Sequence, residues 1–191
     1  MTAHTYYRLC VFLKGHPKTL YRELLFPENG TLDTLAVTVI SIFNAKKWEE
    51  YFLSDAARTY CCTLPLRRNN RYTKANEARL SDLSLSDNTF TMTYFRDVFI
   101  IEILEKCLLE RRFRIPLVTG GTGYGVATEG MNYLSCYLDG SPIPHPITFW
   151  KSGKKTDLDF NAFDLADCNR RLRRDYSRLL DFYDSDPFDS V

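Results

Sequence analysis

The sequence is poor in the residue types from which metal centres and acid–base sites are most often built. It contains only three histidines in 191 residues, His4, His16 and His145. Its six cysteines include no Cys-x-x-Cys pair, so the ligand spacing of a zinc site is absent. Sequence alone leaves open a Ser-His-Asp triad assembled from distant segments, but no histidine here stands in the context of a nucleophile elbow. We therefore predict no catalytic residue, no metal and no cofactor.

Long hydrophobic runs and an excess of either charge are also missing. No stretch approaches the roughly 20 apolar residues of a membrane-spanning helix, and the N-terminus lacks the basic segment and apolar core of a signal peptide. Lys and Arg number 25 against 24 Asp and Glu, a net charge of +1 that gives no global attraction to nucleic acid or to an anionic membrane. We expect a cytoplasmic protein with reduced cysteines and no membrane partner. Cys61 and Cys62 are interpreted as residues on alternate faces of a strand, with a vicinal disulfide as the alternative.

What is present is the composition of a globular protein. Hydrophobic residues make up 45% and aromatic residues 14% of the chain, which excludes a disordered chain. A chain of this length can bury a core without disulfides or metals. The length of the chain predicts a single domain over residues 1–191.

The first third of the chain has the pattern of a hairpin followed by a helix. Residues 5–13 alternate between more and less apolar side chains, which predicts a strand with Phe12 on the less apolar side. A second strand is predicted over residues 19–26. Lys14–Pro17 has the residues of a turn, so the two strands are expected to form a hairpin. Thr31 is the predicted N-cap of a helix that ends near residue 43. The buried side of this helix is expected to hold Leu32, Leu35, Val39 and Ile42.

The middle of the chain favours further strands. They are expected at residues 50–54 and 58–64, and residues 90–104 predict either one long strand or a tight hairpin around Arg96 and Asp97. Residues 105–112 fit either an extension of that strand or a helical turn. The other segments are interpreted as a loop over 67–74, a short helical turn over 80–85, a loop over 120–130, a short amphipathic segment over 131–138 and an irregular stretch over 141–146. This order predicts an α+β fold, a β-grasp-like mixed sheet with a packed helix and a C-terminal helix.

The C-terminal helix is the most clearly marked element. Asp164 is its predicted N-cap, and Asp167 also suits the positive end of the helix dipole. Most of the arginines between residues 170 and 178 fall on one side of it. The residues 184–191 form an acidic tail that is expected to fray. The apolar face, predicted to pack on the sheet, holds Leu165, Cys168, Leu172, Tyr176, Leu179 and Tyr183.

Three segments of the chain resemble a known family. The strand–turn–strand–helix segment of residues 6–43 includes Tyr21-Arg22-Glu23 where that family has W-R-R. Leu80-Ser81-Asp82-Leu83 matches its L-S-D-L, and Phe163-Asp164 with Asn169-Arg170-Arg171-Leu172 matches its F-D-x-x-x-V-N-R-R-L, with Cys168 in place of Val. On these residues the chain resembles the plasmid pRiA ORF-three-like family, which includes TnpR-like passenger proteins of insertion elements. The resemblance implies a divergent member associated with bacterial mobile DNA.

The chain departs from that family at the most chemically suggestive residues. Where many members carry H-L-H-x-F, this chain has Trp48-Glu49-Glu50-Tyr51-Phe52. Where members carry Y-D-F-G-D-x-W-x-H, residues 94–101 keep Asp97 but lose the Gly, Trp and His. If the family residues form a metal or acid–base site, the resemblance implies that this chain has lost it. An enzyme with a degenerate metal site therefore stays as a second alternative function.

Two other patterns are weighed against simpler interpretations. The glycines of residues 120–125 suit a phosphate-binding loop, but no Lys-Ser/Thr follows them, so a flexible loop is preferred. Asp157, Asp159 and Asp164 near Asn161 offer oxygen ligands for a hard cation. The glycine and terminal glutamate of a calcium loop are missing, so a solvated turn is preferred.

Basic clusters are the only candidate binding residues that the sequence offers. They would track phosphates if they converged on one face, with a tyrosine available for base stacking. The competing interpretation is a set of solvated side chains balanced by nearby acids. The arginines of the C-terminal helix form a further cluster. The candidates are Arg67, Arg68, Arg71, Tyr72, Lys74, Arg111, Arg112 and Arg114.

The function predicted from these observations is binding rather than catalysis. We expect a non-catalytic accessory or regulatory protein of a bacterial plasmid, transposon or phage that acts by binding another macromolecule. We rank a protein partner first, with inhibition of a host system as one concrete form, and a nucleic-acid-binding module as the alternative. Converging arginines on the surface favour nucleic acid, whereas an exposed aromatic patch favours a protein.

Overall fold

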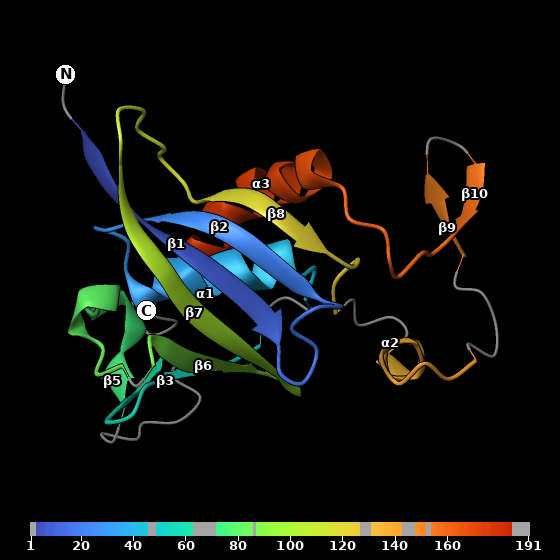
Figure 1. The fold of residues 1–191 in the computed structure, drawn as a ribbon, viewed down its shortest axis with the longest axis horizontal. Coiled ribbons are helices and arrows are strands. Elements are labelled where there is room, and N and C mark those ends of the chain that lie inside the picture. Colours follow the sequence, from blue (N-terminus) through green and yellow to red (C-terminus); the bar gives the residue numbers. More distant parts are fainter. Residues whose placement is uncertain are drawn as a thin grey trace, which may run out of the picture.

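The computed structural model describes residues 3–45, 49–62, 72–85, 87–126, 131–142, 148–151 and 154–184. One large sheet carries helices on one of its faces, and a small hairpin lies away from it (Figure 1). The helices are α1 (Leu32–Ile42), α2 (Met131–Leu138) and α3 (Leu165–Asp184), with 3-10 turns at Ala75–Glu77 and Leu80–Asp82. The strands are β1 (His4–Leu13), β2 (Tyr21–Pro27), β3 (Tyr51–Ser54), β4 (Thr59–Cys61), β5 (Thr73–Lys74), β6 (Thr89–Tyr94), β7 (Asp97–Leu109), β8 (Leu117–Thr122), β9 (Thr148–Lys151) and β10 (Lys154–Asp157).

The large sheet has eight strands in the order β5-β4-β3-β6-β7-β1-β2-β8. Its neighbouring strands are antiparallel except β4 and β5, which run parallel and make the sheet mixed. The strands β9 and β10 form the separate hairpin. The predicted α+β class is therefore confirmed, with a mixed sheet, a helix packed on it and a C-terminal helix.

The N-terminal hairpin places its alternate residues on opposite faces of the sheet. Leu9 lies opposite Leu24, and both are buried on the face that α1 covers. The turn uses Gly15 at φ +86°, a conformation that glycine adopts without steric cost. The strand β2 begins at Tyr21, later than predicted, because Leu20 still belongs to the turn. The Leu20 carbonyl accepts the N–H of Leu13 at 3.1 Å, which closes this turn.

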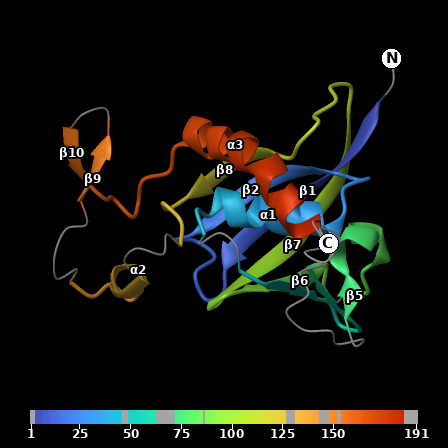
Figure 2. The same cartoon turned by 180° about the vertical axis from the view of Figure 1, so that it is seen from behind.

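The helix α1 is buried on nearly all sides. Thr31 caps it as predicted, since its Oγ1 accepts the N–H of Thr34 at 3.2 Å. Every residue of α1 except Thr34 is buried, not only the predicted side. The reason is that the sheet covers one side of α1 and α3 crosses the other (Figure 2). Packing from two sides supports a helix whose β-branched residues have low intrinsic helix propensity.

The helix α3 begins at its predicted cap and packs mainly on α1, with a second contact to the edge strand β8. Asp164 Oδ1 accepts the N–H of Asp167 at 2.8 Å. Leu172 and Leu179 are fully buried, but Leu165 is 41% exposed because it lies in the first turn, before the helix reaches α1. The prediction that Leu165 packs in the core is wrong, as is the prediction that this face lies directly on the sheet. The tail predicted to fray lies, beyond Asp184, outside the described residues.

Several predicted boundaries change in the structure. Residues 90–104 form a hairpin, since Tyr94 pairs with Asp97 across a turn at Phe95 and Arg96, and β7 continues as a strand to Leu109. Gly120–Thr122 belongs to β8 rather than to a loop. The predicted loop over 67–74 includes β5 at its end, and the rest of that loop, 67–71, lies outside the described residues. The β9–β10 hairpin was not predicted, because its residues carry no strong alternation.

Candidate functional site

The face of the sheet opposite α1 and α3, which we call the outward face, has no helix over its middle in the described part of the chain (Figure 1). Cross-strand register places Tyr21 beside Phe12 and Phe12 beside Ile100. We call these three residues the outward row. All three are partly exposed. A partly exposed row of aromatic and aliphatic side chains on three adjacent strands is a surface suited to a protein partner.

Polar residues border the outward row on one side. Glu23, Cys10 and Glu102 lie next to one another on the three strands β2, β1 and β7. Further along, Arg8 donates to Glu23 and Glu105, each at 3.1 Å. Burial, together with the negative charges of Glu102 and Glu23, raises the pKa of the Cys10 thiol to about 11. Cys10 is therefore a protonated, weakly nucleophilic thiol rather than a reactive one.

On the helix side of the sheet, Arg22 is completely buried and lies between the rings of Phe43 and Phe163, at 5.0 and 4.5 Å from their centroids. Its guanidinium donates to five backbone carbonyls, so all five of its N–H groups are used. None remains for an anionic ligand. Burial lowers the pKa of Arg22 to about 10, which leaves it charged at neutral pH. The acceptors are the carbonyls of Tyr21, Ile42, Thr122, Gly123 and Tyr124.

The glycine-rich segment of residues 120–125 provides three of the carbonyls that bind Arg22. Its carbonyls point at Arg22, so the segment accepts hydrogen bonds from a cation and does not present a ring of N–H groups to a phosphate. A Cβ on Gly123, at φ +72°, would lie 2.8 Å from the Thr19 carbonyl oxygen, and one on Gly125, at φ +136°, would lie 2.2 Å from that of Phe43. Gly123 and Gly125 are therefore required for close packing. The loop prediction is wrong for Gly120–Thr122, which belongs to β8, whereas the described residues 123–126 are outside any helix or strand.

A buried polar cluster ties the two helices to β3 and β6, and sequence reasoning missed it. The Tyr51 hydroxyl donates to the carboxylate of Asp33 in α1, and the Tyr183 hydroxyl donates to the Glu49 carbonyl at 2.7 Å. The hydroxyls of Tyr94 and Tyr183 lie 3.5 Å apart. Burial raises the pKa of all three tyrosines, so they stay protonated and act as fixed donors. This cluster stabilises the packing of α1 and α3 against β3 and β6.

The predicted basic clusters do not all lie together. Tyr72 and Lys74 are at β5, one edge of the sheet, where Tyr72 contacts the ring of Phe52 and Lys74 pairs with Glu77 at 3.3 Å. Tyr72 lines an open pocket of about 430 Å³ that also contains Arg58. Arg67, Arg68 and Arg71 lie outside the described residues.

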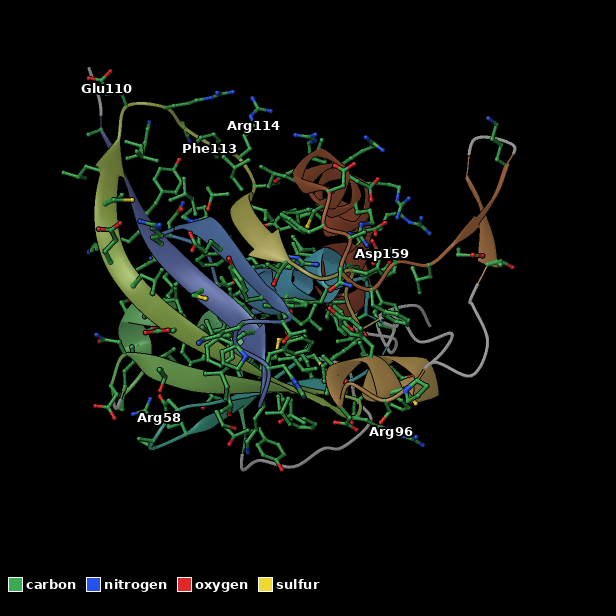
Figure 3. The ribbon with its side chains drawn as sticks, turned by 45° about the vertical axis from the view of Figure 1, so that its right-hand side comes forward. Arg58, Arg96, Glu110, Phe113, Arg114 and Asp159 are labelled. Atoms are coloured by element: carbon green, nitrogen blue, oxygen red, sulfur yellow. The ribbon has the colours of Figure 1, made fainter. Side chains whose placement is uncertain are left out.

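The second basic cluster lies in the connection between β7 and β8, which are four and seven positions away from β5 in the sheet order (Figure 3). Arg111 stacks on Phe113, with 5.2 Å from its guanidinium carbon to the ring centroid, and Arg112 lines a groove of about 350 Å³ with His4. The strand β8 that follows this connection packs on α3, where Asn169 bonds to Val118 through both its amide oxygen and nitrogen. The described members of the two predicted clusters, Tyr72 and Lys74 on one side and Arg111, Arg112 and Arg114 on the other, therefore lie at different parts of the sheet.

The candidate cation ligands serve the local chain instead. Asp159 Oδ1 accepts the N–H of Asn161 at 2.9 Å, the Asn161 side chain accepts the Tyr137 hydroxyl at 2.6 Å, and Asp164 caps α3. In the described residues no three His, Cys, Asp or Glu side chains gather into a metal-binding group. His145 lies outside the described residues.

The two segments that depart from the family's motifs are neighbours in the fold. Tyr51 pairs with Tyr94, and the hairpin that follows carries Asp97. Burial alone raises the pKa of the Asp97 carboxyl to about 6. Glu49 contributes backbone groups to the tyrosine cluster, whereas Trp48 lies outside the described residues. This corner of the sheet therefore contains tyrosines and carboxyls where the family pattern has histidines.

Sequence reasoning placed one member of the outward row correctly. The alternation of residues 5–13 put Phe12 on the side opposite the core, which the structure confirms. Tyr21 and Ile100 carried the same signal in their own strands, but nothing local indicated that the three strands would be adjacent. Arg22 stood out only as part of the family motif, because its five acceptors come from segments up to about one hundred residues away.

Comparisons with known proteins address the fold and no more. No helix in the described part is long and apolar enough to cross a membrane. No family model matches the sequence, and no curated protein is significantly similar to it. A crystal structure of a protein of unknown function from Methanosarcina mazei Go1 is similar, with a TM-score of 0.60 over 87% of this chain and 98% of that chain. At 16% sequence identity, this likeness shows that the two chains share a fold.

Proposed function

We propose that this protein is a non-catalytic accessory or regulatory protein of a bacterial mobile element, a divergent relative of the plasmid pRiA ORF-three-like family. It acts in the cytoplasm by binding a protein partner on the outward face of its sheet. The observation that carries this proposal is the outward row of Tyr21, Phe12 and Ile100, partly exposed and adjacent on three strands.

The surroundings of the outward row support a protein partner over a nucleic acid. Interfaces between proteins have an apolar centre rich in aromatic residues and a polar rim. Here Arg8, Glu23 and Glu102 lie along one side of the row and supply such a rim. Arg8 is paired with two carboxylates, so its charge is already neutralised and is not free for a phosphate backbone.

A site-specific photocrosslink tests the proposal. Phe12 is replaced by p-benzoylphenylalanine, and the variant is expressed and irradiated in a bacterial host that carries the native gene. The matched control carries the same replacement at Ser177, an exposed position on α3. We expect a covalent adduct with a distinct protein at position 12 and none at position 177. The purified partner should then lose binding to the Ile100→Asp variant while it still binds Ser177→Asp. Equal adducts at both positions, or none at position 12, would overturn the proposal.

The nucleic-acid alternative rests on the arginines of the β7–β8 connection and on those of α3, which packs on β8. If these side chains track phosphates, the affinity for random duplex DNA should fall steeply as the salt concentration rises. Replacing Arg111, Arg112 and Arg114 by glutamine should then make this salt dependence less steep. We expect only weak, non-saturating binding at physiological salt, because Asp167 and Asp175 pair with the α3 arginines Arg170 and Arg174. A tight isotherm that depends on these three arginines would favour the nucleic-acid function.

A further inference from the structure

Arg171 in α3 is a largely enclosed cation whose hydrogen-bond donors are not used by the described chain. Its side chain is only 14% exposed, and its guanidinium carbon lies 5.9 Å from the centroid of the Tyr124 ring. Asp167 Oδ2 forms an ion pair with Nε at 3.4 Å. Nε is nevertheless buried without a hydrogen bond in the described part of the chain. Buried donors are almost always satisfied, so this one indicates a partner from outside the chain.

Positive charge exceeds negative charge around Arg171. Burial is the main cause of the lowered pKa of Arg22, and the nearby charge of Arg171 lowers it further. The five acceptors of Arg22 are neutral carbonyls, so among the described residues no carboxylate pairs with it. Asp167 divides its two oxygens between Arg170 and Arg171. Even with the Asp164 cap counted, three arginines here meet two aspartates. Water would satisfy the Arg171 donors, but only an anion also balances this charge.

Tyr124 provides a further donor beside the guanidinium. Its hydroxyl oxygen accepts the side-chain N–H of Asn44 at 3.4 Å, which leaves its own O–H available to donate. The backbone of Tyr124 is fixed on both sides: its N–H donates to the Phe160 carbonyl at 2.9 Å, and its carbonyl accepts from Arg22 at 3.2 Å. Tyr124 is partly exposed. A ligand from solvent therefore meets two prearranged side chains.

We propose that Arg171 and Tyr124 form a binding site for a phosphate group. The N–H groups of an arginine match two oxygens of an oxyanion, and the Tyr124 hydroxyl suits a third oxygen, which phosphate has and a carboxylate lacks. Arg22 does not touch the ligand. It is a positioning residue, because its bonds to the carbonyls of residues 122–124 hold Tyr124 beside α3, and its charge favours an anion.

This site is separate from the outward row. It lies on the helix side of the sheet, where α3 packs on β8 (Figure 2), whereas the outward row lies on the opposite face of β1, β2 and β7. Phosphate binding is a property of the purified protein alone, and the proposed function needs a second protein. The failure of one is therefore distinguishable from the failure of the other.

Calorimetric titration in a phosphate-free buffer of constant ionic strength tests the site. Inorganic phosphate and glycerol phosphate are titrated separately, and the tighter of the two identifies the source of the phosphate group. We expect saturable binding that Arg171→Met weakens at least about tenfold, because it removes charge-assisted hydrogen bonds. The matched control is Arg173→Met, an exposed arginine of the same helix, which should keep the affinity. No saturable binding of either compound, or an equal loss in both variants, would overturn the proposal.

Melting temperatures provide a second measurement that also reports folding. A ligand that binds only the folded state raises the melting temperature. We expect phosphate to raise it for the unmodified protein and for Arg173→Met but not for Arg171→Met. Tyr124→Phe keeps the ring beside Arg171 and removes only the hydroxyl, so it should fold normally and bind phosphate severalfold more weakly. A rise of the same size in Arg171→Met, or an unchanged affinity in Tyr124→Phe, would contradict the site.

Discussion

The two faces of the large sheet are made from alternate residues of the same strands, yet they end in different states. The helix-covered face holds Leu9, Val11, Phe99 and Ile101, all buried under α1. The outward face holds Phe12 and Ile100, which are partly exposed although they are equally apolar. The difference shows that burial is decided by what crosses the sheet. Because these strands carry apolar residues on both sides and the helices cover only one side, the apolar residues of the other side remain available for a partner.

The strongest asymmetry between the faces is Arg22, a charged residue that is buried on the helix side. Arg22→Met removes the donor to five carbonyls and leaves them buried without a partner. We expect a loss of about 3–5 kcal/mol in the free energy of unfolding, measured by urea denaturation. Glu23→Gln, the next residue but on the outward face, should change it by less than about 1 kcal/mol. A small loss for Arg22→Met would show that the site opens to water.

Two adjacent isoleucines compare the faces directly. Ile101 is fully buried and Ile100 is partly exposed. Ile101→Ala should lower the free energy of unfolding by about 2–5 kcal/mol through lost burial and the cavity left behind. Ile100→Ala should cost less than about 1.5 kcal/mol, because part of its side chain is already exposed to solvent. Equal losses would mean that the outward face is covered after all.

The same comparison applies along α3. Leu172 is fully buried against α1, whereas Leu165 in the first turn is 41% exposed. We expect Leu172→Ala to cost about 2–5 kcal/mol and Leu165→Ala to cost less than about 1 kcal/mol, again in urea. A denaturation midpoint for Leu172→Ala that matches the unmodified protein would show that α3 is peripheral to folding.

The smallest expected effect concerns Asp97, a half-buried carboxyl on the same side of β7 as Phe99. Its pKa is raised to about 6 by burial, so the folded state holds its proton more tightly than the unfolded state does. Stability from this group is complete below the unfolded pKa of about 4 and is lost as the pH rises through 6. Asp97→Asn should therefore be more stable than the unmodified protein at pH 7, by about 1 kcal/mol after allowance for solvent screening.

Urea melts of both proteins between pH 4 and pH 8 provide the measurement. The two curves of stability against pH should meet near pH 4, diverge between about pH 4 and pH 6, and stay a constant distance apart above pH 6. Curves that stay parallel across this range would show that Asp97 is solvated.

Local signals predicted most of the elements but few of their contacts. The Thr31 and Asp164 caps, the hairpin of β1 and β2, and the apolar stripe of α3 all depend on residues close in sequence, and the structure confirms them. The strand β8 was missed, because its glycines lack side chains that would show alternation. The basic clusters were identified as residues, but their separation could not be foreseen without the strand order.

The sequence by itself determined the α+β class, the capped ends of α1 and α3, and the division of each strand into two sides, because these follow from side-chain periodicity and from hydrogen bonds within a few residues. The tertiary structure alone decided which side of the sheet is covered, why Arg22 is buried, and which side chains meet around Arg171. These depend on the sheet order and on helices that arrive from distant segments. The candidate protein-binding surface consists of apolar residues that its own helices leave uncovered.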